Sequence, residues 1–365
     1  MSARERQAIV PITLREPPRG SYYAPEFVEL AGIDRVRAVK ERRAPDSPVI
    51  RLTGMRFTDA GLGSVTVVMP ASPWWQAGPG VFTAGALAFL ADAPLGGAVL
   101  TSAPSGVIMS TSELALDFLR PANIRSQTII GRGRLIHATR SLGLSEVFIE
   151  DGLGRLLAHG TSRCVLTPID VEAMKARPRV TFAEETQSDL PDPYLRPVEG
   201  ELLGQEFWDS TPGIEVAQMA VRGERIPPHR ILMGIRTVAV EEGSAIQAMA
   251  ASRWLTNGGG VIYGGALAYF ADSATSLAVA TTTPAATAFA PLDLKVNFLR
   301  PALPSDGELR ATATIIHRGK TMAVVTVEIT GPDGKVIAVA NESVLILPGR
   351  PWDRAVNVAE EMRDL

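Results

Sequence analysis

The sequence predicts an α+β protein that is built from two fused copies of one domain. The segment that begins at Gly80 (GVFTAGALAFLAD) returns at Gly260 as GVIYGGALAYFAD, which is 180 residues further along the chain. Residues 118–122 (FLRPA) return as residues 298–302, again 180 residues away, so both copies keep one spacing. In each copy a helical apolar segment precedes several strand-like segments, an order typical of an α+β domain.

Length and charge limit the classes of protein to which the chain can belong. Its 365 residues are enough for two domains that each bury a core. The formal net charge is −3 and the Lys and Arg residues are scattered, so we expect neither nucleic acid nor a membrane surface as a partner. The apolar stretches near 81–100 and 261–280 each contain an aspartate and fall short of a transmembrane span. The first residues lack the apolar core of a signal peptide, and we expect a cytoplasmic protein.

Composition divides the chain into five predicted segments. A proline- and arginine-rich arm at residues 1–25 precedes the first domain, which is predicted over residues 26–170. Residues 171–206 are charged and rich in proline, as in a linker. The second domain is predicted over residues 207–350, and residues 351–365 form a polar tail.

Each domain is predicted to open with a short helical piece, at residues 25–30 and 202–208. Both pieces run into a step of glycine, isoleucine and an acid, which begins at Gly32 in the first copy and at Gly213 in the second. Alternating apolar and polar residues at 64–69 then predict a strand.

The most apolar segment of each copy is predicted to be a buried helix. It covers residues 83–93 in the first copy and 263–280 in the second, and its Ala, Leu and Phe content favours a helix. Because it is apolar on nearly all sides, we expect it to be enclosed by the rest of its domain. Pro94 is expected to kink the first helix or to make it restart.

The remainder of each copy is predicted to be antiparallel strands joined by hairpins. In the first copy these strands are expected at residues 111–119, 127–137, 143–151 and 156–166, with counterparts 180 residues further on. Turn-forming residues at 151–154 and 331–334 lie where hairpin turns are expected.

The order of these elements resembles the hotdog-fold thioesterases, in particular the PaaI-type acyl-CoA thioesterases of the 4-hydroxybenzoyl-CoA thioesterase superfamily. The resemblance rests on the Gly-rich turn, the buried helix with its Ala-Asp pair and the strand that carries FLRPA, and it covers residues 26–168 and 207–348. It implies a double hotdog, in which two antiparallel sheets are each wrapped around a central helix and lie side by side. It also implies hydrolysis of an acyl-CoA thioester to free acid and CoA, without a metal or redox cofactor.

Family members commonly carry an asparagine, then His-Gly-Gly at the start of the buried helix, then an aspartate two turns along it. The second copy matches this pattern with a tyrosine in place of the histidine; its residues are Asn257, Tyr263, Gly264, Gly265 and Asp272, of which Tyr263 and Gly265 are expected to contact the substrate. Uncovered N–H groups at a helix N-terminus and an asparagine amide can stabilise the oxyanion of a thioester. A buried carboxylate has a raised pKa and can activate water or attack the carbonyl.

One helix cannot supply both halves of such a site. Asp272 lies eight residues beyond Gly264, which corresponds to roughly 12 Å along a straight helix. The resemblance therefore implies that each site combines residues from both copies, as paired subunits do in the family.

Two composite sites follow, and they are not equivalent. The first has an amide and a hydroxyl and comprises Asn257, Tyr263, Gly264, Asp92 and Thr111, where Thr111 is expected to hold water. The second has neither group and comprises Ala77, Thr83, Ala84, Asp272 and Pro291. We predict that the first site is catalytic and the second a relic. A structural alternative for Asp92 is that it caps a helix restarted at Pro94.

Coenzyme A carries phosphates, and cations are expected to contact them. Arg140 and Lys320 are equivalent residues in strand turns where hotdog proteins often contact the nucleotide, with Arg120 and Arg300 as alternatives. No two histidines have the spacing of metal ligands, so we expect no metal site. The one cysteine, Cys164, lies in a strand-like segment and is expected to be a small buried residue.

Two other functions compete with thioester hydrolysis. Hydratases of this fold usually carry a histidine five residues after the aspartate, where this chain has Gly97 and Leu277. A non-catalytic acyl-CoA-binding or scaffolding protein is the stronger alternative, because neither copy keeps the family's histidine. Fused pairs of this type often associate further, and we expect a homodimer of double-hotdog chains.

Overall fold

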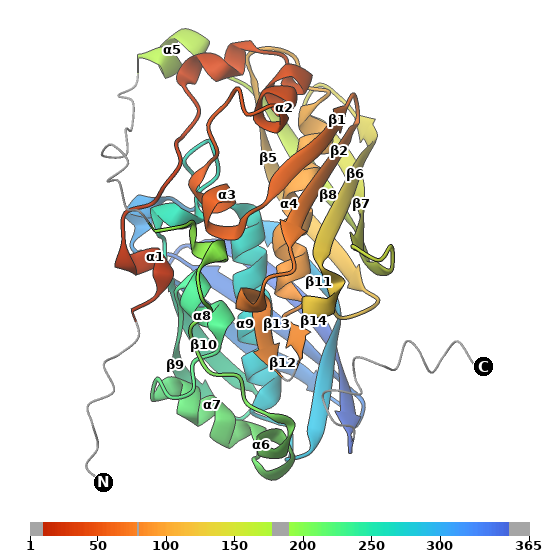
Figure 1. The fold of residues 1–365 in the computed structure, drawn as a ribbon, viewed down its shortest axis with the longest axis vertical. Helices are drawn as coiled ribbons and strands as arrows, with labels where there is room; N and C mark the ends of the chain where they lie inside the picture. Colours follow the sequence, from red (N-terminus) through yellow and green to blue (C-terminus); the bar gives the residue numbers. More distant parts are fainter. Residues whose placement is uncertain (1–9, 79, 177–189, 350–365) are drawn as a thin grey trace, which may run out of the picture.

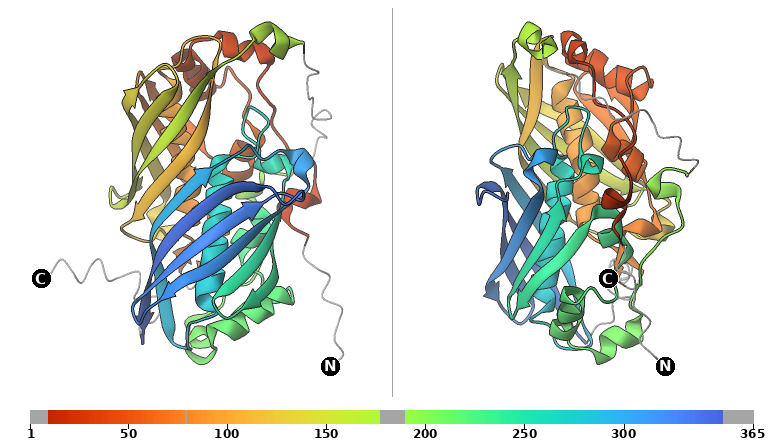
Figure 2. Two further views of the ribbon diagram at one scale, coloured as in Figure 1. Left: turned by 180° about the vertical axis from the view of Figure 1, so that it is seen from behind. Right: turned by 90° about the vertical axis from the view of Figure 1, so that its left-hand side faces the viewer.

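One antiparallel sheet of twelve strands runs through both halves of the chain, in a computed structural model that describes residues 10–78, 80–176 and 190–349. The strand order is β1-β2-β6-β7-β8-β5-β11-β14-β13-β12-β10-β9, which is mirrored about its centre. There β5 (Val107–Phe118) pairs with β11 (Thr287–Phe298), and Leu116 lies opposite Leu294. The two predicted sheets are therefore joined edge to edge, with the first copy above the second in Figure 2.

The remaining strands follow the predicted repeat closely. In the first half they are β1 (Arg56–Gly61), β2 (Ser64–Pro70), β6 (Thr128–Ala138), β7 (Leu142–Asp151) and β8 (Leu156–Pro168). In the second half they are β9 (Ile235–Glu241), β10 (Ser244–Ala250), β12 (Glu308–Arg318), β13 (Met322–Thr330) and β14 (Val336–Pro348). A separate pair, β3 (Gln76–Gly78) and β4 (Val81–Phe82), precedes the central helix of the first half.

Two buried helices lie side by side at the centre of the molecule (Figure 1). They are α4 (Gly85–Leu100) and α9 (Gly264–Ala280), and most of their residues are buried. Each half of the sheet curves around one of them, because α4 packs on β2, β6 and β7 and α9 packs on β10, β12 and β13. This is the arrangement expected of helices that are apolar on nearly all sides.

The expected restart of the first helix at Pro94 is wrong. Helix α4 continues through Pro94 to Leu100, although proline removes a hydrogen bond to the carbonyl of Leu90. Strand β6 fits closely around this point: a Cβ at Gly133 would lie 2.1 Å from the Pro94 carbonyl oxygen. Packing inside the sheet thus outweighs the local preference of proline.

Further helices lie over the outer ends of the central helices and were only partly predicted. The short predicted pieces correspond to the 3₁₀ helix η1 (Pro25–Glu29) and to α6 (Gln205–Ser210). The Gly-Ile-acid steps begin two further helices, α2 (Gly32–Lys40) and α7 (Gly213–Val221). At both steps glycine permits close approach, since a Cβ would lie 1.7 Å from the Leu100 carbonyl oxygen at Gly32 and 2.0 Å from that of Ala280 at Gly213.

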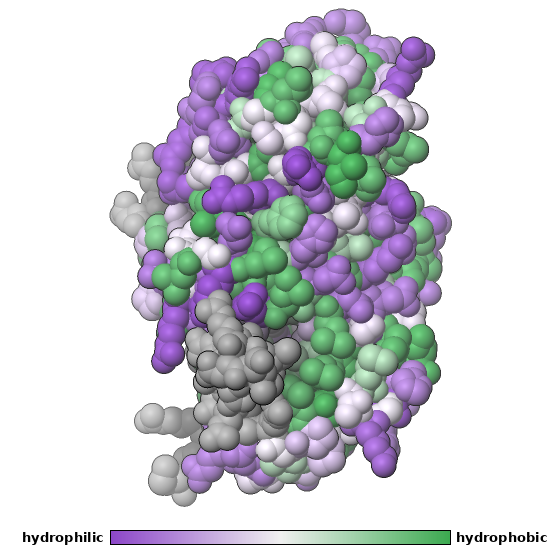
Figure 3. Space-filling view, turned by 90° about the vertical axis from the view of Figure 1, so that its right-hand side faces the viewer, coloured by the Kyte–Doolittle hydropathy of each residue, from purple (hydrophilic) through white to green (hydrophobic). Residues whose placement is uncertain are grey.

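Two more short helices, α3 (Pro48–Thr53) and α8 (Pro228–Met233), are equivalent in the two copies and were not predicted. Each ends at a glycine in the left-handed region, Gly54 and Gly234, both with φ of 75°. This is a common helix C-terminus. Among the described residues, the helices are too short or too polar to cross a bilayer. Figure 3 shows hydrophobic residues interspersed with hydrophilic ones on one face of the molecule.

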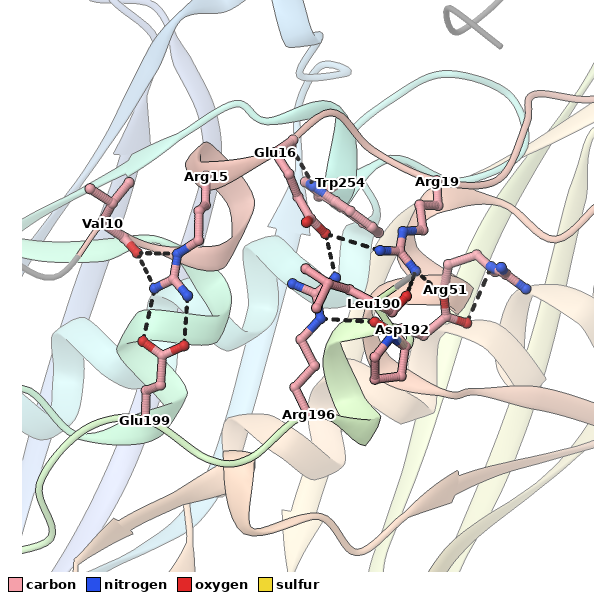
Figure 4. A network of polar contacts seen from close by, with 11 residues as sticks. Val10, Arg15, Glu16, Arg19, Arg51, Leu190, Asp192, Arg196, Glu199 and Trp254 are labelled. Carbon is pink, nitrogen blue, oxygen red and sulfur yellow. Dashed lines mark hydrogen bonds and ion pairs between the residues drawn. The ribbon is translucent and has the colours of Figure 1, made fainter. Parts of the chain in front are cut away.

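The described part of the N-terminal arm packs against the second copy (Figure 4). In α1 (Ile12–Arg15), Ile12 is fully buried and Arg15 forms an ion pair with Glu199 at 2.6 Å. The Trp254 indole donates a hydrogen bond of 3.0 Å to the carbonyl oxygen of Glu16. Residues 10–25 of the arm are therefore packed as part of the fold.

The segment between the two copies also contains ordered structure. It includes α5 (Val171–Lys175) and the 3₁₀ helix η4 (Pro193–Leu195). Asp192 next to η4 lies 3.2 Å from the Arg51 guanidinium and 3.6 Å from that of Arg19 (Figure 4). The predicted domain boundaries stay predictions, because the start of the arm, residues 177–189 and the predicted tail lie outside the described residues.

Candidate active site

Helices α4 and α9 run antiparallel, so that the N-terminus of each lies beside the aspartate of the other. A Cβ at Gly264 would lie 2.8 Å from Asp92 Oδ2, and a Cβ at Gly85 would lie 2.8 Å from Asp272 Oδ2. Glycine at these two positions permits the close approach of each carboxylate. Each of the two pairs therefore combines residues from both copies.

Asp92 is held by partners from two elements. Its Oδ1 accepts a hydrogen bond of 2.8 Å from the Thr111 hydroxyl on β5, and its Oδ2 accepts one of 3.0 Å from the Gly265 N–H of α9. The side chain is buried and lies in the interior of α4, whose N-cap is Ala84. The alternative that Asp92 caps a restarted helix is therefore wrong.

The surroundings of Asp92 adjust its basicity in two opposing directions. Burial raises the pKa of the carboxyl above its ordinary value, while the hydrogen bonds from Thr111 and Gly265 lower it. Burial is the larger effect, so the carboxylate is a stronger base than one in water. A base with a raised pKa is better suited to accept a proton from water near neutral pH.

The N-terminus of α9 supplies two backbone donors with different surroundings. Gly265 N–H donates to Asp92, a contact that the sequence did not predict. Gly264 is the first residue of the helix, and its N–H has no acceptor in the part of the chain that the structure describes. It is thus available to an oxygen of a bound molecule.

Tyr263 links the two central helices directly. Its hydroxyl donates a hydrogen bond of 2.8 Å to the carbonyl oxygen of Phe89, and its ring meets the Phe89 ring edge-on with centroids 5.1 Å apart. The side chain is buried. Its contact with substrate stays a prediction, because the structure uses the hydroxyl to hold α9 against α4.

Asn257, Arg140 and Lys320 form no hydrogen bond or ion pair with Asp92 within the described residues. Asn257 Oδ1 accepts a hydrogen bond of 2.9 Å from Gly259 N–H and so closes its own turn. Arg140 and Lys320 are exposed in the turns that join β6 to β7 and β12 to β13. Their roles toward the carbonyl and the nucleotide stay predictions.

Cys164 is a neighbour of this site that sequence reasoning had placed only in the core. It lies opposite Thr111 in the β5–β8 pairing, with its Sγ 3.6 Å from the Ser162 hydroxyl. Burial is the main reason why the pKa of the thiol is raised to about 12, and the nearby Asp92 charge adds to it. Cys164 is therefore a neutral thiol and not a nucleophile.

The second pair has a different chemistry. Asp272 is fully buried, and neither of its carboxylate oxygens has a hydrogen bond of good geometry within the described residues, although Gly85 N–H lies near enough to lower its pKa. Burial nevertheless raises the pKa of Asp272 to about 6. The buried Glu342 carboxyl lies beside it, and burial and the Asp272 charge raise the pKa of Glu342 well above its ordinary value.

A cavity of about 380 Å³ lies on the side of this second pair. Four residues of the predicted relic line it, namely Ala77, Thr83, Ala84 and Pro291. Ser273 and Ser276, which follow Asp272 in α9, line it as well, whereas Asp272 does not. The cavity therefore lies on the side of the Asp272–Gly85 pair. Asp92, the carboxylate that has hydroxyl and N–H partners, belongs to the other pair.

The comparisons with known proteins agree with this architecture. The Thioesterase superfamily profile matches residues 259–338. Acyl-coenzyme A thioesterase PaaI of Escherichia coli (strain K12) is 34% identical over 106 residues, which are 29% of this chain and 73% of the relative. The chain belongs to the hotdog thioesterase superfamily.

Solved structures with a similar fold match most of the chain. The tesB protein of Mycobacterium avium subsp. paratuberculosis is 13% identical with a TM-score of 0.51, and the match covers 82% of this chain and 98% of that one. The acyl-CoA thioesterase II TesB2 of Mycobacterium marinum is also 13% identical, with a TM-score of 0.49 and coverage of 82% and 97%. The predicted double-hotdog fold is confirmed.

In this hotdog thioesterase the Asp272–Glu342 pair is expected to make stability depend on pH. The pKa of Asp272, about 6, lies above its ordinary value of 3.8, so folding favours the protonated acid. This contribution to stability is complete below about pH 4 and is lost as the pH rises past the raised value. Glu342→Gln removes one acid, and we expect the free energy of unfolding at pH 8 to rise by about 1–3 kcal/mol, with little change at pH 4.

Chemical denaturation followed by circular dichroism at both pH values measures this effect. Glu328→Gln is the matched control, because Glu328 is exposed on the neighbouring strand β13. Equal stability changes for the two variants at pH 8 would contradict the role of the buried pair.

Proposed function

We propose that this protein hydrolyses an acyl-CoA thioester to a free acid and CoA, at the site formed by Asp92. The observation that carries the proposal is the Asp92 carboxylate, which bonds both to Thr111 at 2.8 Å and to the N-terminus of α9 through Gly265 at 3.0 Å. The similarity to an acyl-CoA thioesterase supports the same reaction class. The substrate, acyl-CoA, carries CoA as its leaving group, and the reaction needs no further cofactor.

In the proposed reaction Asp92 acts as a general base. A water molecule donates one hydrogen bond to Asp92 and is positioned by the Thr111 hydroxyl oxygen. Asp92 takes the water proton as the oxygen forms a bond to the thioester carbonyl carbon. The carbonyl oxygen becomes an oxyanion next to the Gly264 N–H at the positive end of α9. Collapse of the intermediate breaks the C–S bond, and the CoA thiolate leaves and receives the proton.

Direct attack by Asp92 on the carbonyl is the alternative path, which would form a mixed anhydride that water then cleaves. A single turnover in ¹⁸O-labelled water detects this path when water cleaves the anhydride at the aspartate carbonyl carbon. Label would enter the aspartate carboxyl only if Asp92 attacks the substrate itself.

Hydrolysis of short, medium, long and aryl acyl-CoA thioesters by the full chain tests the activity. We expect Thr111→Val to lower kcat by about 10- to 100-fold and to change KM less, because the water and the carboxylate lose their shared partner. Thr66→Val is the control, since Thr66 is half-buried on strand β2. A folded wild-type protein that turns over no thioester would favour the non-catalytic acyl-CoA-binding function.

We also propose that the chains form a homodimer in the cytoplasm. Several apolar side chains on β6, β7, β12 and β13 are at least 39% exposed, which supports a further interface; they are Ile136, Leu142, Phe148, Ile316 and Met322. Light scattering that gives the mass of one chain at micromolar concentration would contradict this assembly.

A further inference from the structure

The cavity on the Asp272 side has mainly apolar walls. The first copy contributes Phe82, Leu87 and Phe118, and the second contributes Leu277, Phe289 and Leu345. Its volume of about 380 Å³ lies within the range of small-molecule sites in proteins. Walls of this kind fit a hydrocarbon or aryl group.

Arg230 of α8 lines this cavity without a carboxylate partner. Its Nη1 donates a hydrogen bond of 3.0 Å to the Thr237 hydroxyl, and its Nε is buried with no partner. No acidic side chain of the described residues lies within ion-pair distance of its guanidinium. Burial lowers the pKa of Arg230 to about 10, which reflects a cation whose charge is not neutralised.

The carboxylates that line the cavity are already used by other arginines. Glu201 forms an ion pair with Arg225, and Glu224 lies 3.0 Å from Arg222. Arg120 also lines the cavity and donates a hydrogen bond of 2.9 Å to the Leu156 carbonyl oxygen. The cavity thus carries an excess of positive charge that favours an anion.

Comparison of the two copies indicates that the fold itself does not require Arg230 or the polar residues next to it. The second copy has His229, Arg230 and Tyr269 where the first has the buried residues Val49, Ile50 and Phe89, each 180 positions earlier. The Tyr269 hydroxyl lies 2.5 Å from His229 Nδ1. The Thr83 hydroxyl is close enough to oppose the rise that burial causes in the pKa of Tyr269. His229, Arg230 and Thr83 line the cavity, and Tyr269 contacts it through His229.

We propose that this cavity binds an apolar carboxylic acid, with the carboxylate on Arg230 and the hydrocarbon among the apolar walls, and that no thioester is hydrolysed there. A carboxylate would supply the missing partner of the guanidinium through charge-assisted hydrogen bonds. Hydrolysis is not expected here, since Asp272 does not line the cavity and Pro291 stands where Thr111 serves the other site. The site therefore goes beyond the proposed activity and binds a molecule of the class that the activity releases.

Binding of octanoate to the full chain, measured by isothermal titration calorimetry at pH 7.5, tests the proposal. Octan-1-ol is the matched ligand without charge, and we expect it to bind at least about 10-fold more weakly. Arg230→Gln is expected to weaken octanoate to the level of octan-1-ol, and Arg230→Lys to keep part of the difference. Arg225→Gln is the matched control, because that guanidinium already pairs with Glu201 and lies 5.3 Å from the Phe207 ring centroid.

A second variant keeps the test decisive if Arg230→Gln does not fold. Ser276→Phe places a ring in the cavity from α9 and is expected to abolish octanoate binding. Asp92→Asn is expected to bind octanoate as the wild type does, so a failure of thioester hydrolysis leaves this result unaffected. The proposal is overturned by equal binding of octanoate and octan-1-ol, by no binding of octanoate at millimolar concentration, or by binding that Asp92→Asn removes and Ser276→Phe does not.

Discussion

Asp92→Asn is expected to lower kcat/KM for acyl-CoA hydrolysis by about 10³-fold, within the range for loss of a general base or nucleophile. Asparagine has the shape of the aspartate, and its oxygen can still accept one of the two hydrogen bonds from Thr111 and Gly265. It cannot take the proton of the water. Steady-state release of CoA measures the loss, and the circular dichroism spectrum checks the fold. In the wild type, kcat/KM should fall as the pH drops through the raised pKa of Asp92.

Asp272→Asn is the matched control, because Asp272 is the equivalent residue on the other central helix. We expect kcat/KM to stay within about threefold of wild type, since the residue is fully buried and lacks a hydroxyl partner. Activity lost with Asp272→Asn but kept with Asp92→Asn would reverse the assignment. It would move hydrolysis to the side of the 380 Å³ cavity.

Gly265→Ala is expected to destabilise the protein by about 3 kcal/mol and to lower activity as well. A Cβ at Gly265 would lie 2.4 Å from the Phe89 carbonyl oxygen and 3.0 Å from Phe89 Cα, which are backbone atoms of α4. Because a helix backbone cannot yield as a flexible side chain does, α9 must move away from α4. The Gly265 N–H would then no longer reach Asp92. Urea denaturation measures the stability, and thioester hydrolysis of the folded fraction measures the activity.

Gly204→Ala is the control for this substitution. Gly204 has φ of −70°, and nothing lies within 4 Å of the position that its Cβ would take. It should therefore change stability by less than about 0.5 kcal/mol. Similar midpoints for the two variants would show that the close approach of the central helices is not needed for stability.

The repeat explains why so much of the fold could be predicted from the sequence. Two diverged copies with one spacing identify the central helices and most strands, because the apolar periodicity is seen twice. The continuation of α4 through Pro94 could not be predicted, since it depends on the close fit of Gly133 on a strand far away in the sequence. The pairing of β5 with β11 is likewise a contact between segments whose separate patterns do not specify a partner.

The candidate site, like the fold, could be predicted only in part. The length of a helix excludes a site within one helix, and the resemblance to paired hotdog subunits implies that Asp92 meets the N-terminus of α9. The structure has this contact. It could not be read from the pattern that Gly265 is the donor to Asp92, that Asn257 closes its own turn, or that Cys164 faces Thr111. Each of these depends on strand register or loop conformation. The substitution of Val49 and Ile50 by His229 and Arg230 is visible in the sequence, but the cavity that they share is not.

Covalent fusion changes what a single substitution can do to this molecule. In a symmetric dimer, every altered codon alters both sites at once, so neither can depart from hydrolysis without the other. Here the antiparallel helices α4 and α9 belong to one polypeptide, and the positions of Thr111 and Pro291 are inherited separately. One site can retain its chemistry while the other is free to acquire a new ligand. The different hydrogen-bond partners of the two aspartates follow from that independence.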